Sequence, residues 1–155
     1  MKKFLFLLFS FVLLHFVSSV SFACSCAPPR IGETEIERIK VAHQKAKAIF
    51  SGKVLKVKVR KSSDTNPFPS VQVTFKVLET WKGVETEKVI IATEDNRYGG
   101  CGSEFKVGKT YLVYAYTSES GGLETNQCTR TNELPEAERD LKVLGKGNGP
   151  TKAKT

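Results

Sequence analysis

Hydrophobic and polar residues alternate along two stretches in the first half of the chain. Leucine and valine alternate with lysine and arginine from Leu55 to Arg60, and Val71 to Val77 alternates with polar residues in the same way. A period of two is typical of strands with one buried face. The polar residues from Lys61 to Ser70, which include two prolines, predict a long hairpin loop between these strands.

Three further short strands are predicted from Val89 to Thr93, from Tyr111 to Thr117 and from Leu123 to Thr125. A polar, glycine-rich connection from Glu94 to Gly102 follows the first of them. Five short strands with one long early hairpin predict a mainly β domain, a five-stranded OB-fold barrel with flanking helices. A β-sandwich is the alternative, but it needs more strands than the pattern contains.

Two other stretches have hydrophobic residues at helical spacing. Thr34 and Glu37 form a capping-box pattern, and the spacing that follows predicts a helix from about Glu35 to Ala48. A second helix is predicted from Leu134 to Leu144, where the predicted domain ends. The glycine- and lysine-rich residues 145–155 predict a disordered tail.

The longest apolar run, Phe4 to Val17, follows two lysines near the N-terminus and precedes a cluster of small residues. This order is typical of a secretory signal peptide, here residues 1–23. Ser21 and Ala23 supply the small residues that a signal peptidase requires, so we expect a secreted protein whose mature chain begins at Cys24. A retained membrane anchor and a lipoprotein acylated at Cys24 are the alternatives.

All four cysteines, Cys24, Cys26, Cys101 and Cys128, lie after the predicted cleavage site. An even number of cysteines in a small secreted domain predicts two disulfides. A bridge between Cys24 and Cys26 would strain the bond geometry, which leaves two pairings open. Zinc held by four thiolates is the alternative, and an oxidising compartment disfavours it.

The formal net charge of the chain is +8, and removal of the two lysines within residues 1–23 would leave +6. A basic domain can bind acidic glycans or surfaces, and its charge also favours solubility. The first strand carries a basic stripe made of Lys53, Lys56, Lys58, Arg60 and Lys61. No aromatic residues are interleaved on the face of this stripe, so we do not expect nucleic acid as a partner.

Residues that could support catalysis are few. His43 is the single histidine after residue 23, and the adjacent Glu94 and Asp95 do not form a catalytic pair by themselves. The cysteines are expected to be paired, and the sequence has no nucleophile motif or metal motif. We therefore expect neither an enzyme nor a bound cofactor.

The segment Cys24-Ser25-Cys26, followed by two prolines, resembles the mature N-terminus of the tissue inhibitors of metalloproteinases. Further matching features are Phe50-Ser51-Gly52-Lys53-Val54, Cys101-Gly102 and Gly108-Lys109-Thr110-Tyr111-Leu112-Val113. The resemblance covers Cys24 to Leu144 and implies an OB-fold inhibitory domain. It also implies disulfides from Cys24 to Cys101 and from Cys26 to Cys128. The chain departs from the family in lacking a third bridge and in having glycines just before Cys101.

The function that this resemblance implies is inhibition of a secreted or membrane-bound zinc metalloproteinase by a monomer. The amine and carbonyl of Cys24 would chelate the catalytic zinc of the target enzyme. The residues that the resemblance places against the protease are Cys24, Ser25, Cys26, Ala27, Gly99 and Gly100. The alternative function is a secreted OB-fold module that binds acidic glycans or other surface ligands without inhibiting a protease.

Overall fold

The computed structural model describes residues 24–61, 69–98 and 100–151. The sheet within these residues has the strand order β1-β2-β3-β5-β4-β6, and β1 also pairs with β4. Five strands therefore close into a ring. This arrangement, with two α-helices in the described part of the chain and two disulfides, confirms the predicted mainly β fold class. The predicted signal peptide and Gly99 lie outside the described residues.

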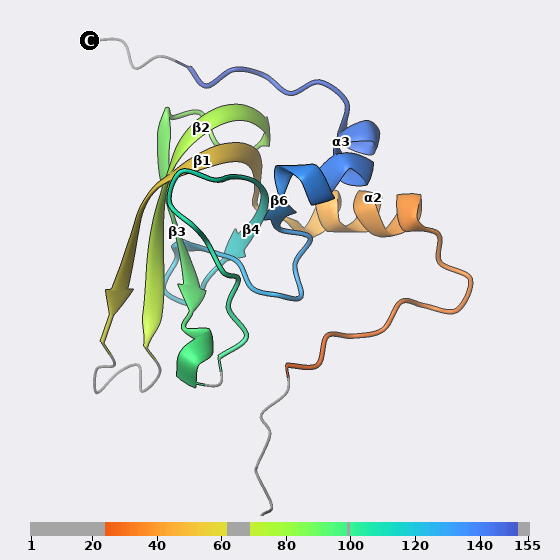
Figure 1. Ribbon diagram of the computed structural model, residues 1–155. Coiled ribbons are helices and arrows are strands. Elements are labelled where there is room, and N and C mark those ends of the chain that lie inside the picture. Colours follow the sequence, from red (N-terminus) through yellow and green to blue (C-terminus); the bar gives the residue numbers. More distant parts are fainter. Residues whose placement is uncertain (1–23, 62–68, 99, 152–155) are drawn as a thin grey trace, which may run out of the picture.

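The helices lie to one side of the ring, and the long β1–β2 ribbon forms the opposite side (Figure 1). The strands are β1 (Ala48–Arg60), β2 (Ser70–Lys82), β3 (Lys88–Glu94), β4 (Thr110–Thr117), β5 (Leu123–Glu124) and β6 (Asn132–Glu133). The α-helices are α2 (Glu35–Lys45) and α3 (Glu138–Leu144), and the 3-10 turns are η1 (Asn96–Tyr98) and η2 (Leu134–Ala137). The β1–β2 ribbon is thus free of helices on its outer face except near the start of β1 and the end of β2.

Strand β1 closes the ring because it pairs on both of its edges. It pairs with β2 along its length and with β4 from Ala48 to Lys53. Its pairing with β2 shifts register in three places, and such bulges bend a strand and increase its twist. A Cβ atom at Gly52 would lie only 3.1 Å from the Phe75 Cβ, so this glycine allows the bent strand to pack closely on β2.

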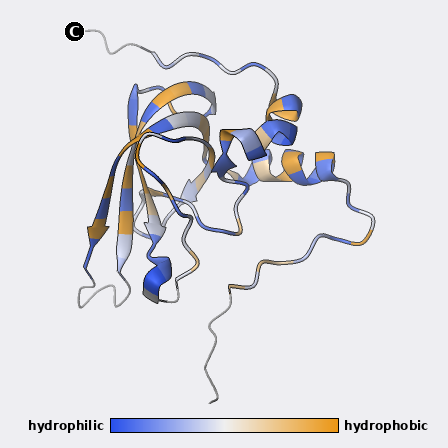
Figure 2. Cartoon of the chain, in the orientation of Figure 1, coloured by the Kyte–Doolittle hydropathy of each residue, from blue (hydrophilic) through white to orange (hydrophobic). Residues whose placement is uncertain are grey.

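The ring encloses the main hydrophobic core. Phe50, Phe75, Phe105 and Tyr111 follow one another in edge-to-face contacts, with ring centroids 4.9–5.5 Å apart. The inward placement of Phe75 follows from the alternation of hydrophobic and hydrophilic residues along β2 (Figure 2). The period of two that predicted the strands therefore also determines which side chains fill the ring.

A second hydrophobic cluster lies between the ring and the helices. Ile49, Leu112 and Tyr114 are fully buried on the outer side of β1 and β4, opposite the ring core. Ala46, next to α2, and Ala137, next to α3, cover them. The start of β1 is therefore buried on both faces, which removes the alternating pattern there.

This double burial explains why the predicted helix boundary at Ala48 is wrong. Helix α2 ends at Lys45, and Ala46 already has an extended backbone with ψ of 139°. The Lys47 N–H donates to the Ala115 carbonyl at 2.8 Å, which aligns the chain with β4. Ala48 is then the first residue of β1. A strand that is buried on both faces has closely spaced hydrophobic residues. In the sequence alone, this spacing cannot be distinguished from the hydrophobic stripe of a helix.

The second predicted helix, Leu134 to Leu144, is divided in the structure. Its first turn is the 3-10 turn η2, and only Glu138–Leu144 is α-helical. The described part of the tail, residues 145–151, lies beside β2: Asn148 exchanges two backbone hydrogen bonds with Thr80, at 2.8 and 2.9 Å. The Trp81 indole N–H donates to the Gly145 carbonyl at 2.9 Å. Composition alone does not show these long-range backbone contacts.

Candidate functional site

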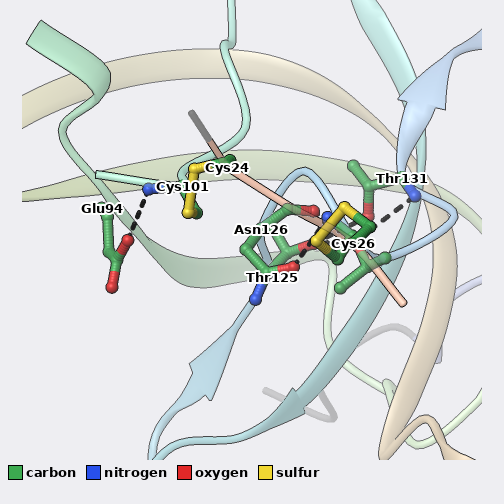
Figure 3. Close-up of a disulfide and its surroundings, with 9 residues drawn as sticks. Cys24, Cys26, Glu94, Cys101, Thr125, Asn126 and Thr131 are labelled. Atoms are coloured by element: carbon green, nitrogen blue, oxygen red, sulfur yellow. Dashed lines mark hydrogen bonds between the residues drawn. A yellow bond between two sulfur atoms is a disulfide. The ribbon is translucent and has the colours of Figure 1, made fainter. Parts of the chain in front are cut away.

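Two disulfides hold the N-terminal segment against the ring (Figure 3). Cys24 is bonded to Cys101 and Cys26 to Cys128, with Cα–Cα distances of 5.5 and 5.2 Å. This is the pairing that the family resemblance implies. Two disulfides in so small a domain indicate an oxidising or extracellular environment.

The two loops that receive these disulfides also contact each other. The Gln127 N–H donates to the Cys101 carbonyl at 2.9 Å. Three separate stretches of the chain are thus joined: residues 24–29, 100–102 and 126–128. We call them the disulfide ridge.

The N-terminal part of the disulfide ridge is exposed and has no regular secondary structure. Ser25, Cys26 and Ala27 are exposed, whereas Cys24 is half-buried. Pro28 and Pro29 follow, and the ring of each proline fixes its own backbone φ angle. The residues predicted to contact a protease from this segment are therefore adjacent and accessible, and Gly100 lies beside them through Cys101.

Glycines allow the 100–102 loop to fold back on the end of β3. A Cβ atom at Gly102 would lie 1.9 Å from the Glu94 carbonyl oxygen, and one at Gly100 would lie 2.9 Å from the Asp95 carbonyl oxygen. The Glu94 carboxylate accepts a hydrogen bond from the Cys101 N–H at 2.6 Å (Figure 3). Larger residues could not approach so closely, so these glycines position the Cys24–Cys101 disulfide.

An ion pair between a buried carboxylate and an exposed arginine holds the turn that leads into this loop. Asp95 is only 5% exposed and accepts hydrogen bonds from the Arg97 Nε at 2.9 Å and the Arg97 Nη2 at 2.6 Å. These hydrogen bonds lower the pKa of Asp95 despite its burial. The Asp95 N–H donates to the Pro69 carbonyl at 3.1 Å, which connects the turn to the start of β2.

Polar side chains hold the loop that carries Cys128. The Asn126 Oδ1 accepts from the Cys128 N–H at 2.9 Å, which forms an Asx turn. The buried Thr125 hydroxyl donates to the Tyr114 carbonyl at 3.0 Å, and the Thr131 hydroxyl accepts from the Tyr114 N–H at 2.9 Å. The loop is therefore anchored on β4 just before and just after the cysteine.

Arg130 connects this loop to both helices. Its guanidinium donates to the two carboxylate oxygens of Asp140 in α3 at 2.7 and 2.8 Å, and it also pairs with Glu35 at the start of α2. Hydrogen bonding to Asp140 is the main reason that the pKa of Arg130 is raised. The segment 27–34 is consequently held at both ends, by the Cys26 disulfide and by the start of α2.

The sequence pattern did not identify Glu94, Asn126 or Gln127 as part of this site. The spacing of Asn126 and Cys128 matches an Asx turn and could have indicated the loop. Gln127 contributes through its backbone N–H, which leaves no signal in the residue type. The contact of Glu94 with Cys101 depends on the fold of the loop, which the sequence pattern does not show.

Across the described residues, no three or more of His, Cys, Asp and Glu are grouped so that they could hold a metal ion. No helix in this part of the chain is long and apolar enough to cross a membrane. Comparison with protein-family models and with curated proteins finds no match to this chain. A function must therefore be argued from the geometry of the disulfide ridge.

Proposed function

We propose that this protein is a secreted inhibitor of zinc metalloendopeptidases, similar in mechanism to the tissue inhibitors of metalloproteinases that its N-terminus resembles. The proposal includes removal of residues 1–23, which exposes the α-amino group of Cys24. It also assigns residues Cys24 to Ala27, together with Gly99 and Gly100, to the contact with the protease.

The observation that best supports this proposal is the way in which Cys24 is held. Its side chain is bonded to Cys101, and Cys26, two residues after Cys24, is bonded to Cys128. The neighbouring Ser25 and Ala27 are exposed. A terminus that is rigid and accessible loses little conformational entropy on binding, which favours high affinity.

The chemistry of an N-terminal cysteine in a disulfide suits a catalytic zinc. Such a zinc keeps one coordination position open for water or substrate. The amine nitrogen and the carbonyl oxygen of Cys24 can form a five-membered chelate ring with the metal and displace that water. The sulfur of Cys24 cannot compete for the metal because it is bonded to Cys101.

Extension of the N-terminus tests this mechanism. We expect one alanine added before Cys24 to weaken inhibition of a susceptible zinc endopeptidase at least about 100-fold, because the amine at the chelating position becomes an amide. The measurement is the inhibition constant on a fluorogenic peptide. The matched control carries the extra alanine after Thr155. Equal inhibition by both proteins would reject chelation by Cys24.

The acidity of the medium provides a second test of the same amine. An α-amino group has an ordinary pKa of about 7.7 to 8.0, and only its neutral form binds zinc. Inhibition should therefore weaken by about tenfold for each pH unit below that range. An inhibition constant that does not change between pH 6 and pH 7.5, with a target active throughout, would exclude the amine as a ligand.

A further inference from the structure

The outer face of strands β1, β2 and β3 carries a concentration of positive charge that the proposed inhibition does not use. Residues on this face are those that alternate with the buried positions of the three strands. Its basic members are all exposed, and we call them the basic face: Lys53, Lys56, Lys58, Arg60, Lys76 and Lys88. The sequence showed only the part on β1, and the fold adds one lysine from each of the next two strands.

Strand register brings three of these lysines side by side. Lys53 is opposite Lys76 in the β1–β2 pair, and Lys76 is opposite Lys88 in the β2–β3 pair. Neighbouring strands are about 4.8 Å apart, so the three lysines form a row across the sheet. Like charges directly opposite each other destabilise a sheet, which means that this row has an energetic cost in the free protein.

No acidic side chain among the described residues forms an ion pair with the cations of the basic face. The acidic residues of these strands are Glu79 in β2, which is opposite Ser51, and Glu94 at the far end of β3, whose carboxylate accepts a hydrogen bond from the Cys101 N–H. An external anion can therefore relieve the repulsion between these cations.

The arrangement of the charges favours a long anion over a small one. Lys56, Lys58 and Arg60 follow one another along β1 at intervals of about 6.6 Å, since alternate residues of a strand point the same way. The row of three lysines crosses the sheet beyond their Lys56 end. A chain with regularly spaced negative groups can contact several of these residues at once, whereas a single small anion cannot.

The uncharged residues of the face indicate which kind of polyanion fits. Gln72, Thr74, Ile90 and Ala92 occupy the outward positions between the lysines. They offer hydrogen bonds and small apolar contacts, and none is aromatic. Recognition of single-stranded nucleic acid depends on stacking of bases on aromatic side chains. Saccharide rings with sulfate or carboxylate groups do not need such stacking.

We propose that the basic face binds an acidic polysaccharide. This binding goes beyond protease inhibition and does not require it. Lys88 begins β3, and Glu94, which contacts the ridge loop, ends it. The six residue steps between them correspond to about 20 Å, so the row of lysines lies well away from the disulfide ridge. A polysaccharide on this row of lysines does not need to cover Cys24.

The test uses the disulfide-bonded mature chain and immobilised heparin, a densely sulfated polysaccharide. The face variant changes Lys53, Lys76 and Lys88 to Gln. The control variant changes Lys40, Lys45 and Lys106 to Gln; these exposed lysines lie outside the face, so the net charge of the two variants is the same. We expect the face variant to bind heparin at least about tenfold more weakly than the control variant. The slope of log affinity against log salt concentration should also become shallower, by the release of about three fewer counterions.

Weaker binding of the face variant than of the control supports the proposal. Equal loss of heparin binding in both variants would overturn the proposal, because net charge alone would then explain the binding. Competition assays distinguish the sources of negative charge. If a single-stranded oligonucleotide or anionic lipid vesicles compete better than soluble heparin at equal charge, the polysaccharide assignment is wrong. Inhibition of the protease, measured in parallel, should be unchanged by the face variant.

Discussion

The ring of strands and the disulfide ridge are held by different forces, although they belong to one domain. In the ring, Phe50 and Phe75 are completely buried, and backbone ladders connect every strand to its neighbours. In the disulfide ridge, the residues from Ser25 to Pro29 are exposed and have no strand partners. Disulfides and single hydrogen bonds hold this segment in place.

This difference separates stability from the proposed activity. Burial of apolar surface stabilises the ring, and the residues that provide it do not reach the proposed contact with a protease. The disulfide ridge contributes little buried surface, so its side chains can change without loss of the fold. Its geometry depends instead on Cys101, Cys128 and the few polar groups that hold their loops. Substitutions in the two regions should therefore have different consequences.

The largest expected effect on stability comes from Phe75→Ala. Phe75 is fully buried and contacts both Phe50 and Phe105 edge to face. The free energy of unfolding should fall by about 3–5 kcal/mol, because the substitution leaves a cavity in the ring core. Urea denaturation measures this change. The control is Ile90→Ala on the exposed face, which should change stability by less than about 0.5 kcal/mol. Similar values for the two variants would contradict the assignment of the core.

Removal of one disulfide should affect the ridge more than the ring. We expect the Cys26→Ser/Cys128→Ser variant to lose about 2–4 kcal/mol of stability while it keeps its strand content. Hydrogen exchange should accelerate at the amides of residues 100–102 and 126–129, and protection in β1 and β2 should persist under native conditions. Inhibition should be lost. Equal loss of protection in the ring and in the ridge would show that the two are not separable.

The smallest expected effect concerns Asp95 and depends on pH. The Arg97 hydrogen bonds lower the pKa of Asp95 in the folded protein. Its contribution to stability is therefore complete above its unfolded pKa of about 3.9, and it is lost as the pH falls through the lower folded value. Asp95→Asn should cost less than about 1 kcal/mol at pH 7, because the Arg97 partner is largely exposed to solvent.

Stability measured from pH 7 to pH 2 checks this prediction. The difference between the wild-type protein and Asp95→Asn should shrink below about pH 4, since the wild-type carboxylate becomes protonated there. The control is Glu104→Gln, at an exposed position in the connection that follows the disulfide ridge. A constant difference over the whole pH range would show that the Arg97 hydrogen bonds do not stabilise this turn.

Much of the fold could be predicted because local periodicity survives folding wherever one face of an element is buried. The alternation from Val71 to Val77 correctly predicted part of β2, and the capping box at Thr34 correctly predicted the start of α2. Prediction failed from Ala46 to Ala48, where the helix was expected to continue and the chain instead enters β1, whose start is buried on both faces. It also did not find β6, which is only two residues long.

The candidate site could be predicted in part, because its cysteines are identifiable as residues. Their even number predicted two disulfides, and the resemblance implied the correct pairing. The support of the site could not be predicted in the same way. Glu94 and Gln127 contact Cys101 only because two loops distant in sequence meet at the end of β3.

The amino-acid sequence by itself therefore determined most of the strands, the first turn of α2 and the positions of the cysteines, because these depend on neighbours within a few residues. Tertiary structure alone decided that Lys53, Lys76 and Lys88 form one row, and that three loops combine into a disulfide ridge. Strand register and loop contacts join residues far apart in the chain, and no local pattern records which partner each residue will meet.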